Sequence, residues 1–189
     1  QVMEYARDRG VDVSLFTWNT FVYGTEPSGY GITDAVANAT TRDYVRRSVR
    51  ALFNTYPLLS AIGITSGENM GDQSSGTAAK ERWLWETYGL GVGDAMADAR
   101  DPGSPYYRPG RVIRLIHRAH QSNLADIVAH FGQLPGYADA DSTLSFSFKY
   151  SQAHMHSSTQ PLFIHQNGWF DTIPPGKTTW LTVRNDDMY

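Results

Sequence analysis

The chain of 189 residues contains no cysteine. This absence excludes disulfide bonds, metal sites built on thiolates and a cysteine nucleophile, but it does not choose between cytoplasm, periplasm and exterior. No apolar run approaches the roughly 20 residues of a membrane-spanning helix. There is no block of lysine and arginine, and the formal net charge is −3. We therefore expect no nucleic-acid or membrane partner, and instead a neutral or acidic molecule, small or polymeric.

What the chain does contain is enough apolar material for a single core. Hydrophobic residues make up 41% of the sequence and aromatic residues 13%, which is sufficient to bury a sizeable core in one domain spanning residues 1–189. The sequence opens at Gln1 in a helical pattern. We expect it to be a fragment of a longer protein.

Short segments rich in β-forming residues alternate with helical patterns along the chain. In the segment 40–56, Val45, Val49 and Phe53 recur at helical intervals, and Thr40 with Asp43 has capping-box spacing. Glycines predict the ends of two other helices. The expected strands are 11–18, 61–65, 111–117, 144–150 and 179–184, and the expected helices end at Gly10 or span 40–56, 80–88 (ended by Gly89), 92–99 and 123–131.

This alternation predicts an α/β fold with right-handed crossovers in a parallel sheet. Two architectures satisfy it: an open doubly wound sheet and a (β/α)8 TIM barrel. No glycine-rich nucleotide-binding motif follows a predicted strand, and polar residues follow every strand, so the pattern favours the barrel. A complete barrel needs about 250 residues. We therefore expect a partial barrel with about five of its eight strands in this chain.

The predicted strand exits carry the candidate functional residues. The run 61–65 ends in small residues and then a single acid, Glu68, at the place where barrel enzymes hold catalytic groups. Parallel strands would bring the exits to one rim. The residues expected there are Trp18, Asn19, Glu68, Asn69, His117, Arg118, His120, Lys149, Tyr150 and 184–187.

Cleavage of a glycosidic bond requires two carboxyl groups flanking the bond. Glu68 and either Asp186 or Asp187 supply such a pair, with Glu68 as the general acid/base and an aspartate as nucleophile or base. The alternative for Glu68 is a structural carboxylate paired with an arginine. The alternative for the two aspartates is a turn, since their side chains readily bond to nearby backbone.

Two segments, 148–155 (FKYSQAHM) and 180–187 (WLTVRNDD), are similar to parts of bacterial carbohydrate-active proteins. With Glu68, they make the chain resemble (β/α)8 glycoside hydrolases of the large clan whose acid/base follows strand 4 and whose nucleophile follows strand 7. The chain departs from the clan pattern where Gly67 precedes Glu68. The resemblance implies a hydrolase of oligosaccharides or polysaccharides that needs no cofactor or metal, in a periplasmic or secreted setting.

Several further residues suit sugar binding. Asn19, His120, Lys149 and Arg184 are expected to orient the substrate, and aromatic faces suit stacking on a sugar ring. The cations Arg118, Lys149 and Arg184 hint at an acidic sugar, so uronic-acid enzymes such as α-glucuronidases are a plausible subclass. The complete set of predicted binding residues is Trp18, Asn19, Asn69, Arg118, His120, Lys149, Tyr150, His154, Trp169 and Arg184.

Two alternatives remain open at this point. Histidines 117, 120, 154 and 156 could hold a divalent cation together with Glu68 or Asp187, as in a metal-dependent hydrolase or isomerase. The chain could also be a sugar-binding fragment without catalysis. An open five-stranded segment exposes its edge strands, so the expected partner is the remainder of the barrel or a second copy of the chain.

Overall fold

A computed structural model describes residues 1–17, 29–66, 76–119, 122–139, 142–149, 173–174 and 176–182, with backbone alone at 148–149 and 181–182. Strands and helices alternate through these segments. The strands are β1 (Val13–Phe16), β2 (Leu59–Thr65), β3 (Arg114–Arg118), β4 (Leu144–Lys149) and β5 (Thr179–Thr182). The helices are α1 (Val2–Arg7), α2 (Ala39–Thr55), α3 (Thr77–Leu84), η2 (Trp85–Gly89), α4 (Leu90–Arg100) and α5 (Leu124–Phe131).

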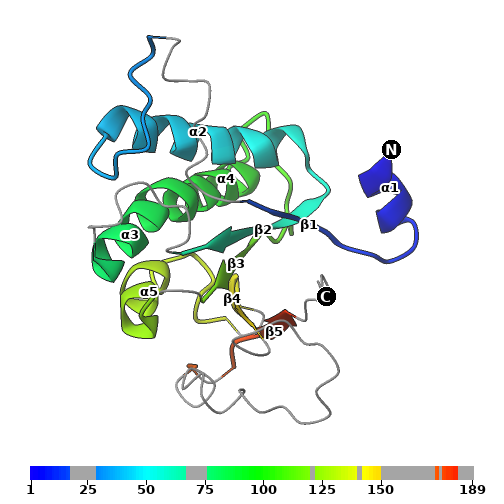
Figure 1. The fold of residues 1–189 in the computed structure, drawn as a ribbon. Helices are drawn as coiled ribbons and strands as arrows, with labels where there is room; N and C mark the ends of the chain where they lie inside the picture. The colour runs from blue at the N-terminus through cyan, green and yellow to red at the C-terminus, as the bar shows by residue number, and fades with distance from the viewer. Residues whose placement is uncertain are drawn as a thin grey trace, which may run out of the picture.

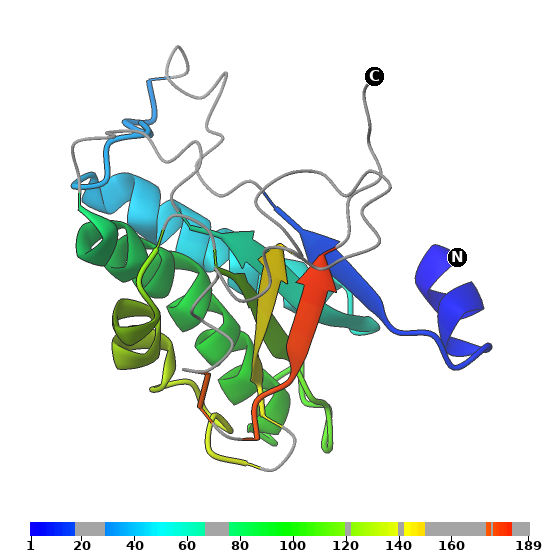
Figure 2. The ribbon, with the colours of Figure 1, turned by 60° about the horizontal axis from the view of Figure 1, so that its bottom comes forward.

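The five strands form one parallel sheet in the order β1-β2-β3-β4-β5. Helices α2 to α5 lie together on one side of it, as two views of the ribbon show (Figures 1 and 2). The α/β class with a parallel sheet interleaved with helices is thus confirmed. The sheet is not closed among the described residues, because β1 pairs only with β2 and β5 only with β4.

The helix-facing side of the sheet forms the core. Ile64, Leu115 and Phe146 are completely buried, and they pack with helix residues such as Phe53 and Phe131 in one continuous cluster. Full burial of each such side chain stabilises the fold by roughly 1.5–3 kcal/mol. β2 is buried along most of its length, as the apolar sequence of this strand predicts.

Helix α2 begins at Ala39, one residue earlier than its sequence pattern predicts. Its N-cap is Asn38, whose side-chain oxygen accepts a hydrogen bond from the Thr41 backbone N–H at 3.1 Å. The predicted capping box at Thr40 and Asp43 is therefore wrong. The buried stripe of Thr41, Val45, Val49 and Phe53 otherwise follows the predicted helical spacing.

Gly89 does not end a helix, contrary to the sequence prediction. α3, η2 and α4 follow one another without a break, and the middle segment is one turn of π-helix. At Gly89 an added Cβ would lie 2.3 Å from the Trp85 ring. Residue 89 is a glycine because the Trp85 ring occupies the space that a side chain at this position would need.

Helices α2 and α4 are joined by paired charges as well as apolar contacts. Arg46 donates two hydrogen bonds to Asp94 at 2.7 and 2.8 Å, and Arg50 donates two to Asp98, both at 2.7 Å. At Gly91 of α4, an added Cβ would lie 2.7 Å from the Arg46 carbonyl oxygen. Close backbone approach therefore fixes the distance between the two helices.

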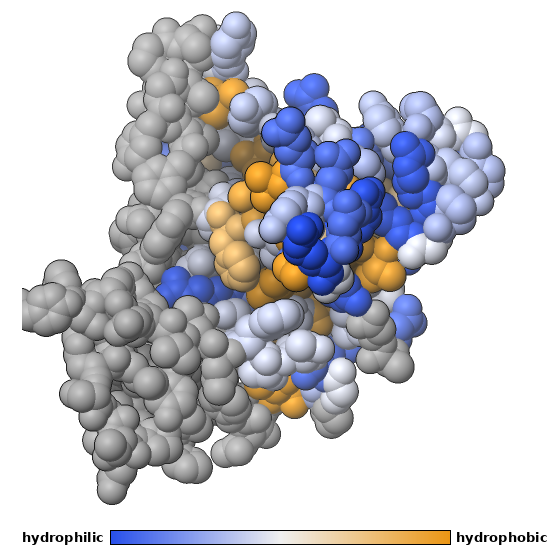
Figure 3. All heavy atoms as spheres, turned by 90° about the vertical axis from the view of Figure 1, so that its right-hand side faces the viewer, coloured by the Kyte–Doolittle hydropathy of each residue, from blue (hydrophilic) through white to orange (hydrophobic). Residues whose placement is uncertain are grey.

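No helix in the described segments is long and apolar enough to span a bilayer. On the side of the molecule that carries α1, apolar residues lie among strongly hydrophilic ones (Figure 3). Leu15 and Phe16 of β1 are 44% and 55% exposed. The β1 edge of the sheet is thus apolar as well as unpaired within the described part of the chain.

Candidate functional site

The carboxyl ends of the strands meet at one edge of the sheet, as the parallel order requires. There Thr65 of β2 lies beside Arg118 of β3, which in turn lies beside Ser147 of β4. We call Thr65, Arg118 and Ser147 the strand-end row. Alternation along β3 places the row on the sheet face opposite the helices, since the neighbouring His117 contacts helix α3.

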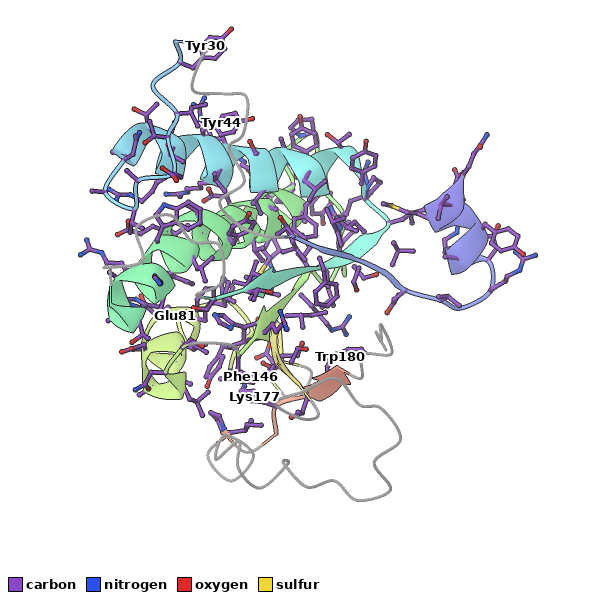
Figure 4. All side chains as sticks on the ribbon, in the orientation of Figure 1. Tyr30, Tyr44, Glu81, Phe146, Lys177 and Trp180 are labelled. Atoms are coloured by element: carbon purple, nitrogen blue, oxygen red, sulfur yellow. The ribbon has the colours of Figure 1, made fainter. Side chains whose placement is uncertain are left out.

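Gly63 and Ser145 precede the strand-end row on the same face, with Ile116 between them, and aromatic residues flank the row. Gly63 of β2 lies beneath the Phe16 ring, because an added Cβ would come within 2.2 Å of that ring. On the other side, the indole Nε1 of Trp180 donates a hydrogen bond to Ser145 Oγ at 3.0 Å. Trp180 is 51% exposed and lies on β5 (Figure 4). This face therefore combines a guanidinium, the hydroxyls of buried residues and two exposed aromatic rings.

A buried imidazole–carboxylate pair lies on the helix-facing side of the same edge. His117 Nε2 is 2.8 Å from Glu81 Oε2, and both side chains are completely buried. Glu81 extends from α3 toward the sheet (Figure 4), and the Phe131 ring packs edge-on against the imidazole at 5.0 Å. Within the described residues, Glu81 Oε1 and His117 Nδ1 have no hydrogen-bond partner. The pair joins the helix layer to β3 directly beneath the strand-end row.

A second polar contact joins the helix layer to β1. The Tyr88 side chain forms a hydrogen bond with the Thr17 side chain at the end of β1, and burial raises the pKa of the Tyr88 phenol. Tyr88 belongs to the π-helical turn η2. Such a turn changes the direction of the side chains that follow it. Glu81 and Tyr88 thus tie one continuous helical segment to the ends of two strands.

The structure places the predicted site residues as follows. Arg118 lies in the strand-end row, as expected for a rim residue. The Lys149 backbone ends β4 in register with Thr182. The other predicted site residues lie outside the described residues: Glu68, Asp186 and Asp187 among the catalytic ones, and Trp18, Asn19, Asn69, His120, Tyr150, His154, Trp169 and Arg184 among the binding ones.

His117 is not a rim residue, and this prediction was wrong. The imidazole points to the helix side and is tied to Glu81. The error arose because residue 117 lies one position before the end of β3, and consecutive strand residues point to opposite faces. Among the described residues, no three histidine, aspartate or glutamate side chains form a group that could hold a metal ion. His120, His154 and His156 lie outside them.

Sequence reasoning missed Glu81. A signal was present, because Glu81 shares a helical stripe with Leu84 and Tyr88, at intervals of three and four residues. Leu84 is completely buried and Tyr88 is 5% exposed. A carboxylate in the middle of a buried stripe requires a partner, and this would have pointed to a buried histidine or cation.

No protein-family model, curated protein or solved structure matches this chain.

Proposed function

We propose that this chain is part of a (β/α)8-barrel carbohydrate-active hydrolase that cleaves glycosidic bonds at the carboxyl ends of its strands. The observation that carries the proposal is the sheet order β1-β2-β3-β4-β5, with α2 to α5 on one side of the sheet in the described part of the chain. Doubly wound sheets reverse their strand order and bear helices on both faces. A sequential order with one-sided helices is the arrangement of a barrel wall.

Chain connectivity supports Glu68 as the general acid/base. Glu68 follows Ser66, the last described residue after β2, by two positions, so their Cα atoms lie within about 7 Å. In this proposal the carboxylate lies at the edge of the sheet that holds the strand-end row. In this proposal Glu68 protonates the leaving oxygen of the glycosidic bond.

Chain connectivity likewise supports Asp186 or Asp187 as the second carboxylate. Asp186 follows Thr182 of β5 by four positions, which allows a reach of about 14 Å. β2 and β5 are three strand spacings apart, also about 14 Å. Chain length therefore permits the two carboxylates to reach the separation that glycosidases use, about 5 Å for a nucleophile or 6.5–9.5 Å for a base that activates water.

The strand-end row supports an acidic sugar as substrate. Arg118 presents a guanidinium between the hydroxyl-bearing Thr65 and Ser147, and a guanidinium binds a carboxylate with two parallel hydrogen bonds. We propose that it binds the carboxylate of a uronic-acid residue. The rim amides, cations and rings of the neighbouring loops would then bind the hydroxyls and faces of the sugar.

The experiment is hydrolysis of a panel of 4-nitrophenyl glycosides that includes the glucuronide. Glu68→Gln is expected to lower kcat by at least about 100-fold while sugar binding persists, and Glu4→Gln on the exposed α1 is the control. Near-normal turnover by a folded Glu68→Gln variant would refute the assignment. Activity lost with a chelator and restored by a divalent ion would instead favour the metal-dependent alternative.

A further inference from the structure

A cavity of about 520 Å³ lies between the segment that precedes α2, the first turn of α2, α3 and η2. Small apolar residues form much of its wall, namely Ala35, Val36, Ala37 and Ala79. Trp83 also contributes to the wall, although it is only 2% exposed. The volume falls in the usual range for small-molecule sites. None of the described residues that line it comes from a strand, so it is separate from the strand-end row.

In the charged part of the wall, two arginines pair with the same carboxylate. Glu86 accepts hydrogen bonds from the Arg82 Nε at 2.8 Å and pairs with the Arg42 Nε at 3.0 Å. Arg42 is further fixed by donating to the Val36 carbonyl oxygen at 3.0 Å. We call Arg42, Arg82 and Glu86 the arginine cluster. Its formal charge is +1, and the shared carboxylate holds the guanidiniums in place.

Donors remain available in this cluster. Glu86 engages the Nε atoms, and the terminal nitrogens of Arg82, whose side chain is 70% exposed, bond no other described residue. By contrast, Arg46 and Arg50 each use Nε and a terminal nitrogen on a carboxylate of their own. Trp83, which also lines the cavity, has a buried Nε1 without a partner among the described residues. Solvent-facing guanidinium donors and surplus positive charge beside a partly apolar cavity favour an anionic group with an apolar body.

We propose that this cavity binds a small organic carboxylate, whose oxygens pair with the arginine cluster while its apolar body packs against the alanines and Val36. A carboxylate fits because a guanidinium offers it two parallel donors. The apolar wall distinguishes this ligand class from a bare inorganic anion. The site is independent of the proposed hydrolase chemistry, because it shares no described residue with the strand-end row.

The test uses isothermal titration calorimetry of the chain with benzoate, with neutral benzamide as the matched compound and inorganic phosphate as the bare anion. Benzoate is expected to bind at least about tenfold more tightly than benzamide, because the charge-assisted bonds are lost in the amide. Arg82→Gln should weaken benzoate binding about tenfold or more, and Ala79→Leu should weaken it by filling the cavity. Arg47→Gln, on an arginine of α2 that pairs with Asp43, should change nothing.

Several results would overturn the proposal. One is absence of benzoate binding by the wild-type chain at millimolar concentrations. Another is unchanged benzoate affinity in the folded Arg82→Gln variant. Phosphate that binds as tightly as benzoate and is insensitive to Ala79→Leu would indicate a bare anion site. Benzoate binding lost in Arg118→Gln but retained in Arg82→Gln would assign the ligand to the strand-end row instead.

Discussion

The contact between α2 and α4 and the carboxyl edge of the sheet use polar groups in different ways. Between the helices, each arginine meets its own carboxylate, as in the pairs of Arg46 with Asp94 and Arg50 with Asp98. At the carboxyl edge, Glu81 and His117 are buried with one atom each left without a described partner. The first arrangement satisfies its charges at a partly exposed surface, where each pair adds little stability. The second ties α3 to β3 inside the core, where the loss of one partner costs far more stability.

Removing one partner of the buried pair should have the largest effect on stability. Glu81→Ala leaves His117 buried without its acceptor, and breaking such a pair costs about 3–5 kcal/mol. The midpoint of urea unfolding measures this cost. Glu86→Ala, which removes a partly exposed carboxylate from the same helical segment, is the control and should cost much less. A loss below about 1 kcal/mol for Glu81→Ala would show that the pair is not a structural tie.

The close approach of α2 and α4 predicts an intermediate effect. Gly91→Ala places a Cβ 2.7 Å from the Arg46 carbonyl oxygen, so the helices must separate, at a cost of about 1–3 kcal/mol. Gly93→Ala in the same helix meets nothing within 4 Å and should stabilise by up to about 1 kcal/mol through helix propensity. Thermal unfolding of the two variants gives the comparison. Equal melting temperatures would contradict the packing argument.

The paired charges between α2 and α4 predict the smallest effect, and a dependence on pH. Arg50 holds the pKa of Asp98 below its usual value through their hydrogen bonds. A depressed pKa in the folded state adds stability above the unfolded value near 4, and this stability is lost as the pH falls through the folded value. Arg50→Gln should cost about 0.2–1 kcal/mol at pH 7.

Stability measured from pH 7 to pH 2 checks this prediction. The wild-type chain should lose more stability on acidification than Arg50→Gln, so the two curves should approach one another below about pH 4. Arg47→Gln, which breaks an exposed pair within α2, serves as the control. Parallel curves for the wild type and Arg50→Gln over the whole range would show that Arg50 does not stabilise the fold by lowering the pKa of Asp98.

Periodicity predicted the architecture well because it records which residues must be buried. The alternation of apolar runs placed all five strands, and the stripe of Val45, Val49 and Phe53 placed α2. It failed at Gly89, since a glycine needed for a close ring contact has the same appearance as one that ends a helix. The presence of a glycine alone does not tell a helix end from a close contact; the residues packed around it must be known.

The candidate site was less predictable than the fold. Arg118 was placed at the rim and lies in the strand-end row, whereas His117 was placed there and lies on the opposite face. Consecutive residues of a strand point to opposite faces of the sheet, so only one of these two neighbours could belong to the row. The pair of Glu81 and His117 joins residues 36 positions apart. Such a contact depends on the packing of α3 against β3, which local sequence does not encode.

The most direct test of the division between a structural helix side and a functional strand-end row is the turnover of Arg118→Gln against that of Arg114→Gln. Both arginines lie on β3 and on the same face, but only Arg118 is at its carboxyl end. Our account predicts that Arg118→Gln lowers kcat/KM for an aryl glucuronide by about tenfold or more, with a melting temperature close to that of the wild type. It predicts near-wild-type turnover for Arg114→Gln. Equal turnover in the two folded variants would contradict the account.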